Sequence, residues 1–168
     1  MARRAFFSFH FERDSWRASQ VRQMGVIEGN APCSDNEWEQ VKRGGDSAIK
    51  AWIDGQLDGK SCAIVLVGLE TATRPWITYE IESAWNSGKG VFGIRVHNLK
   101  DRNGAQAVAG GNPFDNLHFI QQPTKLLSSV AALHYPPYAD SKDVYAHIYD
   151  NLEQWIEDAI ELRANFSL

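Results

Sequence analysis

The sequence has few cysteines, and neither of them stands in a spacing that suggests a bridge or a metal site. Cys33 and Cys62 belong to no Cys-x-x-Cys pair and to no Cys/His cluster. Cys62 opens an apolar stretch and is predicted to be a small core residue. At 168 residues the chain is long enough to bury a core without disulfides or structural metal.

Long hydrophobic runs are also missing. The longest, residues 62–69, is eight residues long, whereas a helix that spans a bilayer needs about 20. The chain opens with Met-Ala-Arg-Arg and its first apolar run is short, so no signal peptide is expected. A cytoplasmic location is the simplest expectation.

There is no excess of basic charge. The chain has 17 Lys and Arg against 21 Asp and Glu, and a formal net charge of −4. This balance argues against binding to nucleic acid or to an anionic membrane, because both require a basic surface. With 43% hydrophobic residues, the chain is predicted to form one globular domain over residues 1–168.

Several nucleotide-binding and catalytic signatures are absent. There is no G-x-G-x-x-G after the first apolar segment, no G-x-x-x-x-G-K-[ST] loop and no G-x-S-x-G elbow. Residues 67–69 (V-G-L) lack the aspartate of a phospho-receiver domain, and residues 9–13 are unlike the phosphate loop of a flavodoxin.

Short apolar segments alternate with helical patterns along the chain. Strands are predicted at residues 5–9, 63–67 and 91–96, with shorter ones at 26–27 and 130–133. Continuous apolar strands of this kind are typical of a parallel sheet that is covered on both faces. We therefore predict an α/β fold of the flavodoxin-like, doubly wound class, with a mostly parallel five-stranded sheet in the order 2-1-3-4-5.

Helix signals lie between these strands. Asp14 or Ser15 is predicted to cap a helix that carries Trp16, Val21 and Met24 on one side, and Asp46 is predicted to cap a second. Two more are expected at about residues 74–87, with Pro75 in the first turn, and 141–164, capped by Asp140. Residues 97–115 form a polar insert that is too long for an ordinary turn.

The fold itself predicts where a ligand binds. In open α/β sheets the site lies beyond the carboxyl ends of the strands, at the point where the strand order reverses. Here that point lies between the first and third strands. The candidates in the adjoining segments are Ser8, His10, Glu12, Asp14, Glu70, Trp76 and Glu80.

Glu80 is the strongest of these candidates. It lies at the edge of the buried stripe of its helix, and Trp76 lies one turn earlier on the same edge. A carboxylate beside an aromatic ring in a cleft can stabilise a cationic sugar centre or hydrogen-bond ribose hydroxyls. The alternative is that Glu80 only favours the helix N-terminus electrostatically and that Trp76 is a core residue.

Other polar and aromatic residues have simpler explanations. His10 is either a structural group or a site residue by virtue of its loop position, and Trp38 either packs a short helix or stacks on a base. Glu12 with Asp14 resembles an acidic pair for Mg²⁺ but has no third partner. The remaining histidines are predicted to be structural, and no metal site is expected.

Two segments resemble TIR domains. Residues 74–81 (R-P-W-I-T-Y-E-I), with the segment 88–94 that follows, resemble the W-x-x-x-E-I helix and next strand of this family. Residues 5–10 (A-F-F-S-F-H) resemble the first TIR strand, written F-[IV]-S-[YF].

The resemblance is closer to the TIR-like proteins of the Thoeris anti-phage system. These carry a W-E pair, a G/S-D before the second helix and an insert that ends in N-P-F-D. Here those motifs are residues 38–39, 45–46 and 112–115, and the resemblance covers about residues 1–120.

This resemblance implies an enzyme that cleaves the nicotinamide–ribose bond of NAD with one glutamate, which falls on Glu80. NAD is then a substrate, and no cofactor is expected. The positions implied to bind substrate are Phe6, Ser8, Phe9, His10, Trp38, Asp46 and Trp76. Many TIR enzymes carry an arginine where this chain has His10.

The family further implies a signalling nucleotide, such as a cyclic ADP-ribose isomer, that activates a separate effector protein. A phage-derived trigger and a homo-oligomeric active state are the other implied partners. Two alternatives remain: a TIR scaffold that acts through assembly without chemistry, and a flavodoxin-like sensor that binds a nucleotide without cleaving it.

Overall fold

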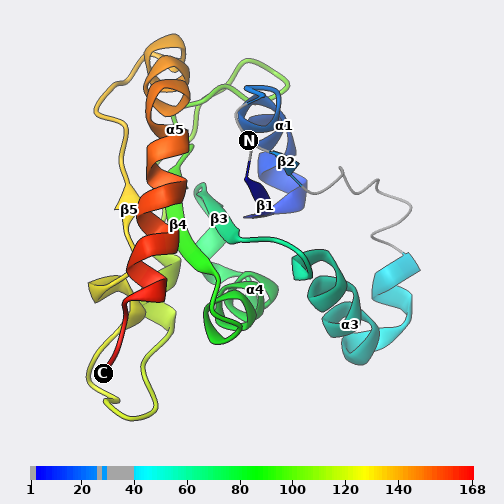
Figure 1. Cartoon of the computed structure of the whole chain (residues 1–168). Coiled ribbons are helices and arrows are strands. Elements are labelled where there is room, and N and C mark those ends of the chain that lie inside the picture. Colours follow the sequence, from blue (N-terminus) through cyan, green and yellow to red (C-terminus); the bar gives the residue numbers. More distant parts are fainter. Residues whose placement is uncertain (1–2, 26–27, 30–39) are drawn as a thin grey trace.

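The computed structural model describes residues 3–25, 28–29 and 40–168 and contains a five-stranded parallel sheet (Figure 1). Its strands are β1 (Arg4–Phe9), β2 (Glu28–Gly29), β3 (Cys62–Val67), β4 (Gly90–Arg95) and β5 (Leu133–His134). The spatial order is β2-β1-β3-β4-β5, and every pairing is parallel. This is the flavodoxin-like order predicted from the sequence.

Of the two short edge strands that were predicted, only the last can be compared with the structure. Residues 26–27 lie outside the described residues, and β2 is the pair that follows them. The prediction of a last strand at 130–133 was wrong by about three residues. The amides of Val130 and Ala131 bond back to the carbonyl of Leu127 in a 3-10 turn, so they are not available to the sheet.

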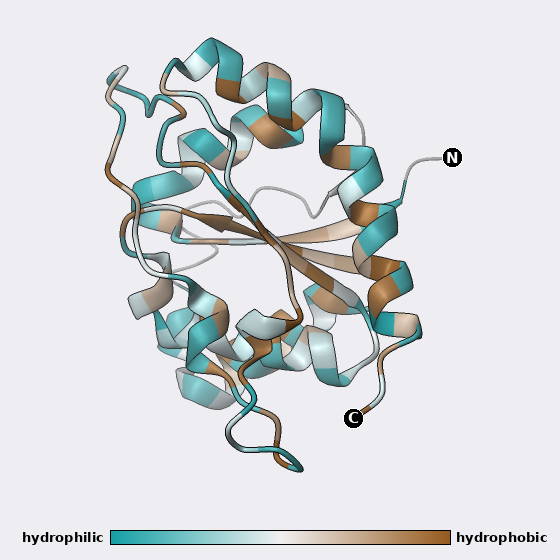
Figure 2. Ribbon diagram, turned by 90° about the vertical axis from the view of Figure 1, so that its left-hand side faces the viewer, coloured by the Kyte–Doolittle hydropathy of each residue, from teal (hydrophilic) through white to brown (hydrophobic). Residues whose placement is uncertain are grey.

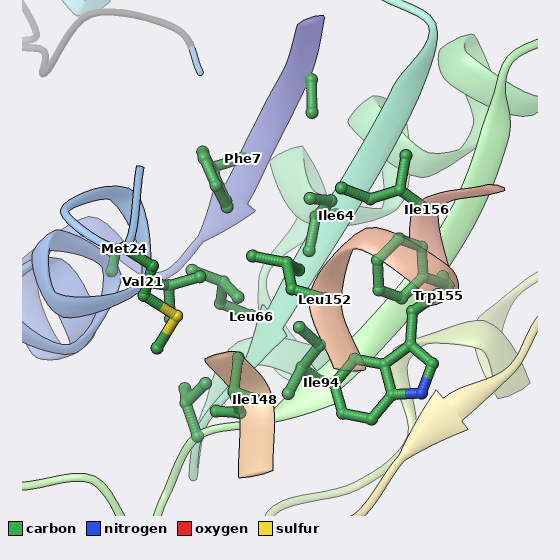
Figure 3. Packing of buried hydrophobic residues seen from close by; sticks show 14 of the residues in the cluster. Phe7, Val21, Met24, Ile64, Leu66, Ile94, Ile148, Leu152, Trp155 and Ile156 are labelled. Carbon is green, nitrogen blue, oxygen red and sulfur yellow. The ribbon is translucent and has the colours of Figure 1, made fainter. Parts of the chain in front are cut away.

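Helices cover both faces of the sheet (Figure 2). Helices α1 (Phe11–Arg22) and α5 (Ser141–Ala164) pack on one face, and α3 (Gly45–Leu57) and α4 (Pro75–Asn86) pack on the other. Successive strand residues alternate between the two cores, as the pleat requires. Figure 3 shows the first core, where Phe7 of β1, Val21 of α1 and Leu152 of α5 lie in one buried cluster.

Helix α1 begins earlier than predicted, at Phe11 rather than beside Asp14 or Ser15. Its N-cap is His10, whose Nδ1 accepts a hydrogen bond from the amide of Arg13 at 3.3 Å. Asp14 is instead buried within the helix. The buried face comprises Asp14, Arg17, Ala18 and Val21. Trp16 is 50% exposed, so the prediction that it shares one side of the helix with Val21 and Met24 was wrong.

The other helices follow their predicted patterns, with one difference in capping. Helix α3 begins at Gly45 with Gly44 as N-cap, so Asp46 lies in its first turn rather than at the cap. Pro75 occupies the first turn of α4, and the Asp140 side chain accepts from the amide of Lys142 at the start of α5. No helix in the described part of the chain is long and apolar enough to cross a membrane.

The polar insert returns to the body of the protein at the carboxyl edge of β3. A Cβ on Gly110 would lie 2.2 Å from the carbonyl oxygen of Leu69, so only glycine fits this contact. Arg95 donates to the carbonyl of Gly110 at 2.7 Å, and the 3-10 turn Pro113–Asn116 follows. The insert therefore covers part of the edge where a ligand was expected.

Candidate functional site

A cavity of about 280 Å³ opens beside β1, between the starts of α1 and α4 and the body of α3. Its aromatic lining comprises Phe6, Phe7, Phe9, Phe11, Trp52 and Trp76. Its polar lining comprises His10, Glu12, Arg22, Lys42, Arg74 and Glu80. A concave, largely aromatic cavity with a few polar groups is typical of small-molecule sites.

The cavity lies on the β1 side of the predicted switch point, because the crevice between β1 and β3 is already filled. A Cβ on Gly68, just after β3, would lie 2.3 Å from a carboxylate oxygen of Asp14. Gly110 of the insert is packed against Leu69, the residue that follows Gly68. Asp14, a predicted site residue, is thus part of the packing that closes the crevice.

Glu80 points toward β1 and meets Ser8 there. The hydroxyl of Ser8 donates a hydrogen bond to Oε2 of Glu80. Ser8 lies on the face of β1 that α4 covers and is buried. The Glu80 residue has intermediate exposure, because the cavity opens beside it, and its hydrogen bond to Ser8 is partly buried. The structure therefore brings together two residues that are 72 positions apart.

The environment of Glu80 disfavours its charged form. Burial raises the pKa of Glu80 to about 8, and the hydrogen bond from Ser8 opposes this rise. Perturbed carboxylates in cavities are typical of catalytic sites, where a group must change or hold its charge near neutral pH. The same shift is the expected result of placing a carboxylate in a mostly aromatic pocket.

Trp76 lies one turn before Glu80 on α4 and lines the same cavity, as predicted. Its ring meets Tyr79 edge to face, at 5.8 Å between centroids. The Tyr79 hydroxyl in turn donates to the carboxylate of Asp54 on α3 at 3.0 Å. These contacts fix the indole at the cavity wall, where it can pack against a flat or apolar group of a ligand.

Replacing Ser8 by alanine is expected to raise the pKa of Glu80 further, by about one unit. The change removes a hydrogen bond that favours the carboxylate, and such bonds contribute about 1.5–3 kcal/mol. An NMR titration of the side-chain carboxyl carbon measures the shift directly. Ser87→Ala is the control, because that hydroxyl bonds only within the end of α4. An unchanged Glu80 titration in Ser8→Ala would mean that the hydroxyl does not set this pKa.

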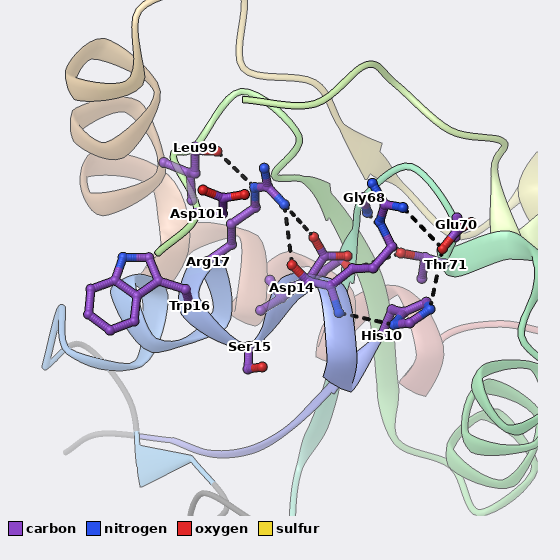
Figure 4. A network of polar contacts seen from close by, with 12 residues as sticks. His10, Asp14, Ser15, Trp16, Arg17, Gly68, Glu70, Thr71, Leu99 and Asp101 are labelled. Atoms are coloured by element: carbon purple, nitrogen blue, oxygen red, sulfur yellow. Dashed lines mark hydrogen bonds and ion pairs between the residues drawn. The ribbon is translucent and has the colours of Figure 1, made fainter. Parts of the chain in front are cut away.

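His10 lines the cavity, but its position has a structural cause. Its Nδ1 accepts from the Arg13 amide, so the ring proton is placed on Nε2, which faces Glu70 Oε2 at 3.6 Å (Figure 4). Burial, with Arg74 nearby, lowers the pKa of His10. A neutral His10 caps α1, while its Nε2 faces Glu70 and is buried without a hydrogen-bond partner among the described residues.

The other predicted residues divide into four groups. Phe6 and Phe9 line the cavity. Asp46 is exposed on the first turn of α3 and is not among the lining residues. Trp38 lies outside the described residues. Glu12 sits at the rim, 3.8 Å from Arg74, whereas Asp14 pairs with Arg17 in the interior, so the two carboxylates do not converge on a metal.

Eight of the lining residues were not predicted as site residues: Phe7, Phe11, Arg22, Lys42, Trp52, Arg74, Pro75 and Ile77. Among them, Trp52 stands with Ile49, Ile53 and Leu57 at a helical spacing that is typical of a core stripe, and the spacing of Arg22 and Lys42 gives no signal. Their contribution depends on how α1 and α3 pack beside β1, and only the charge of the two cations could have suggested a role. Within the ranges that the structure describes, no group of three His, Cys, Asp or Glu residues could hold a metal ion.

Fold and site together define a TIR-like domain, and comparison with known proteins agrees. Residues 6–101 match the family described as "Thoeris protein ThsB, TIR-like domain". The chain belongs to this ThsB TIR-like family. This range contains Ser8, Trp76 and Glu80.

A relative from Bacillus cereus (strain MSX-D12) carries the name "Putative cyclic ADP-D-ribose synthase ThsB1". It is 36% identical over 124 residues, which cover 71% of this chain and 65% of the relative. The match therefore spans less than two thirds of that protein.

Proposed function

We propose that this chain cleaves the nicotinamide–ribose bond of NAD and joins the ADP-ribose part into a cyclic signalling nucleotide. The observation that carries the proposal is the Glu80 carboxylate, held by Ser8 in an aromatic cavity beside Trp76. The name of the relative, a cyclic ADP-D-ribose synthase, agrees with this chemistry. The product would activate a separate effector protein in anti-phage defence.

The reaction would begin with departure of nicotinamide. The C1′–N bond breaks, the electron pair leaves with neutral nicotinamide, and the ribose becomes an oxocarbenium-like cation. The Glu80 carboxylate stabilises this charge at short range, where little water screens it. Trp76 packs beside the nicotinamide or ribose and limits the entry of water.

A nucleophile then completes the reaction. If a hydroxyl of the same ADP-ribose attacks C1′, the product is cyclic and one proton is released, so that NAD⁺ yields cyclic product, nicotinamide and H⁺. If water attacks instead, the products are ADP-ribose, nicotinamide and H⁺. Glu80 is placed to accept the released proton. The shape of the cavity around the acceptor decides between these outcomes.

The pKa of Glu80 predicts how the rate depends on pH. With a pKa of about 8, most Glu80 is protonated at neutral pH and lacks the charge that stabilises the cation. We expect kcat/KM for NAD to rise with pH and level off above about 8. The kcat profile should have its midpoint at lower pH, because the cationic nicotinamide ring favours ionised Glu80 in the complex. A profile that falls between pH 6 and 8 would contradict this role.

Incubation of the purified chain with NAD, with products read by liquid chromatography and mass spectrometry, tests the proposal. Release of nicotinamide, together with a product that has the mass of ADP-ribose less water, is the expected result. Release of nicotinamide with ADP-ribose as the other product would support the proposed cleavage and contradict the proposed cyclisation. No nicotinamide release, with or without lysate from infected cells, would favour a scaffold that acts through assembly.

A further inference from the structure

The cavity crosses the edge of the sheet. Among the described residues, β2 pairs with β1 only at Arg4 and Ala5, so its pairing ends before the carboxyl half of β1. Phe6 packs in the core under α3 and α4, and Phe7 packs in the opposite core under α1 and α5. Both side chains nevertheless line the same cavity. The cavity therefore runs from Glu80 on one face, around β1, to the other face.

Arg22 lies at the end of the cavity away from Glu80. Its guanidinium carbon is 5.7 Å from the centroid of the Phe7 ring and 5.5 Å from that of Phe9, so the group is packed against both rings. Arg22 lines the cavity and is of intermediate exposure. The strand therefore separates a carboxylate at one end of the cavity from a guanidinium at the other.

Arg22 has no counter-charge in the described part of the chain. Its Nε is buried without a hydrogen-bond partner. By contrast, Arg74 at the cavity mouth is paired with Glu12 at 3.8 Å. A partly desolvated guanidinium with free donors is a strong site for an anion, because it can donate two parallel hydrogen bonds to phosphate or carboxylate oxygens.

We propose that Arg22 binds the diphosphate of the dinucleotide substrate and so fixes its direction in the cavity. This inference rests on the proposed function and extends it to a specificity residue. NAD carries a positive charge on the nicotinamide ring and negative charges on the diphosphate. The cavity has the complementary charges, because the Glu80 carboxylate lies on one face of β1 and the Arg22 guanidinium lies on the other. Phe7 and Phe9 hold the guanidinium by cation–π contact and exclude water from the phosphate contact.

Binding of ADP-ribose measured by calorimetry tests the proposal without turnover. Wild type is expected to bind ADP-ribose more tightly than adenosine, which has no phosphate. Arg22→Gln should weaken ADP-ribose binding by about tenfold or more, the range for a lost charge-assisted hydrogen bond, and leave adenosine binding unchanged. Arg22→Lys should lie between, because lysine keeps the charge and loses the fork. Arg102→Gln, an exposed change on the insert, is the control.

Two further readouts separate this proposal from packing effects and from the proposed function. In wild type, added salt should weaken the binding of ADP-ribose and leave the binding of adenosine unchanged. This measurement does not depend on whether a variant folds. In NAD turnover, Arg22→Gln should raise KM and leave kcat nearly unchanged. Equal ADP-ribose affinity in wild type and Arg22→Gln, or no preference for ADP-ribose over adenosine, would overturn the proposal. Tight ADP-ribose binding without nicotinamide release would reject the proposed cleavage and retain the phosphate site.

Discussion

Glutamine in place of Glu80 is expected to lower kcat for nicotinamide release by about 10²–10³-fold or more. The substitution keeps the size of the side chain and an oxygen that can accept from the Ser8 hydroxyl. It removes the negative charge that faces the developing cation. Loss of one preorganised electrostatic group in a water-poor site typically reduces kcat by this factor. Nicotinamide release at saturating NAD, followed by chromatography, measures the effect.

The matched control for this variant is Glu82→Gln. Glu82 lies two residues along the same helix and is exposed, outside the cavity. It loses the same charge, so its turnover should remain near that of wild type. A Glu80→Gln variant with wild-type turnover would contradict the catalytic role of the carboxylate, and equal losses in both variants would point to net charge rather than to the site.

The same substitution is expected to stabilise the fold at high pH. The folded-state pKa of Glu80 is raised from 4.5 to about 8, so the native protein holds this proton more tightly than the unfolded chain does. Glu80 therefore lowers stability progressively as pH rises from about 4.5 to 8, and Gln does not. The shift sets an upper limit of about 5 kcal/mol on the gain, which water in the open cavity reduces. Thermal unfolding of both proteins at pH 5 and pH 9 separates this gain from the loss of activity.

If Glu80→Gln gains stability and loses turnover, the fold keeps a carboxylate at this position although its charged form is unfavourable there. Active sites commonly keep such groups at the expense of stability. If Tm were equal for both proteins at pH 9, the carboxylate would be better solvated in the folded chain than its surroundings indicate.

Local patterns predicted the positions of Glu80 and Trp76 on one edge of α4, because both their spacing and the helix that carries them are local features. The period of α4 places the two side chains on one edge, and Pro75 fixes where that helix begins. The order of the strands also followed from local signals, since apolar segments separated by helices favour a parallel sheet. These parts of the prediction needed no knowledge of distant contacts.

The shape of the cavity could not be predicted in the same way. Arg22 becomes a lining residue only because α1 folds back over β1 and places its guanidinium on Phe7 and Phe9. Asp14 had two sequence interpretations, as a cap and as a site residue. Its main role is to pack in the crevice beside Gly68. Local patterns could not predict this, because that crevice is formed by residues far along the chain.

Arg17 makes the contacts that hold Asp14 in the interior. Among the changes considered, the loss of Arg17 is expected to have the largest effect on stability. Its Nε donates to the carbonyl of Leu99 at 2.8 Å and its Nη1 to Asp14 Oδ1 at 2.9 Å (Figure 4). Its Nη2 donates to the carbonyl of Ala105 at 3.1 Å. Arg17 and Asp14 are 3% and 1% exposed. One guanidinium thus joins α1 to two points of the polar insert.

Arg17→Met should lower the free energy of unfolding by about 3–5 kcal/mol, because it leaves the Asp14 carboxylate buried without a counter-charge. For a chain of this size that corresponds to a decrease in Tm of about 6–20 °C. Burial already raises the pKa of Asp14, and Arg17 opposes that rise. In the variant Asp14 can therefore take up a proton, and the deficit relative to wild type should be smaller at pH 5 than at pH 8.

A double variant, Asp14→Asn with Arg17→Met, separates the charge from the packing. It removes the unpaired carboxylate, so it should recover part of the stability lost in Arg17→Met and should lose the difference between pH 5 and pH 8. The two carbonyls of the insert stay without their donor, so recovery should be incomplete. A double variant no more stable than Arg17→Met would mean that the guanidinium acts mainly by holding the insert. In that case the buried ion pair would matter less for stability than the hydrogen bonds to Leu99 and Ala105.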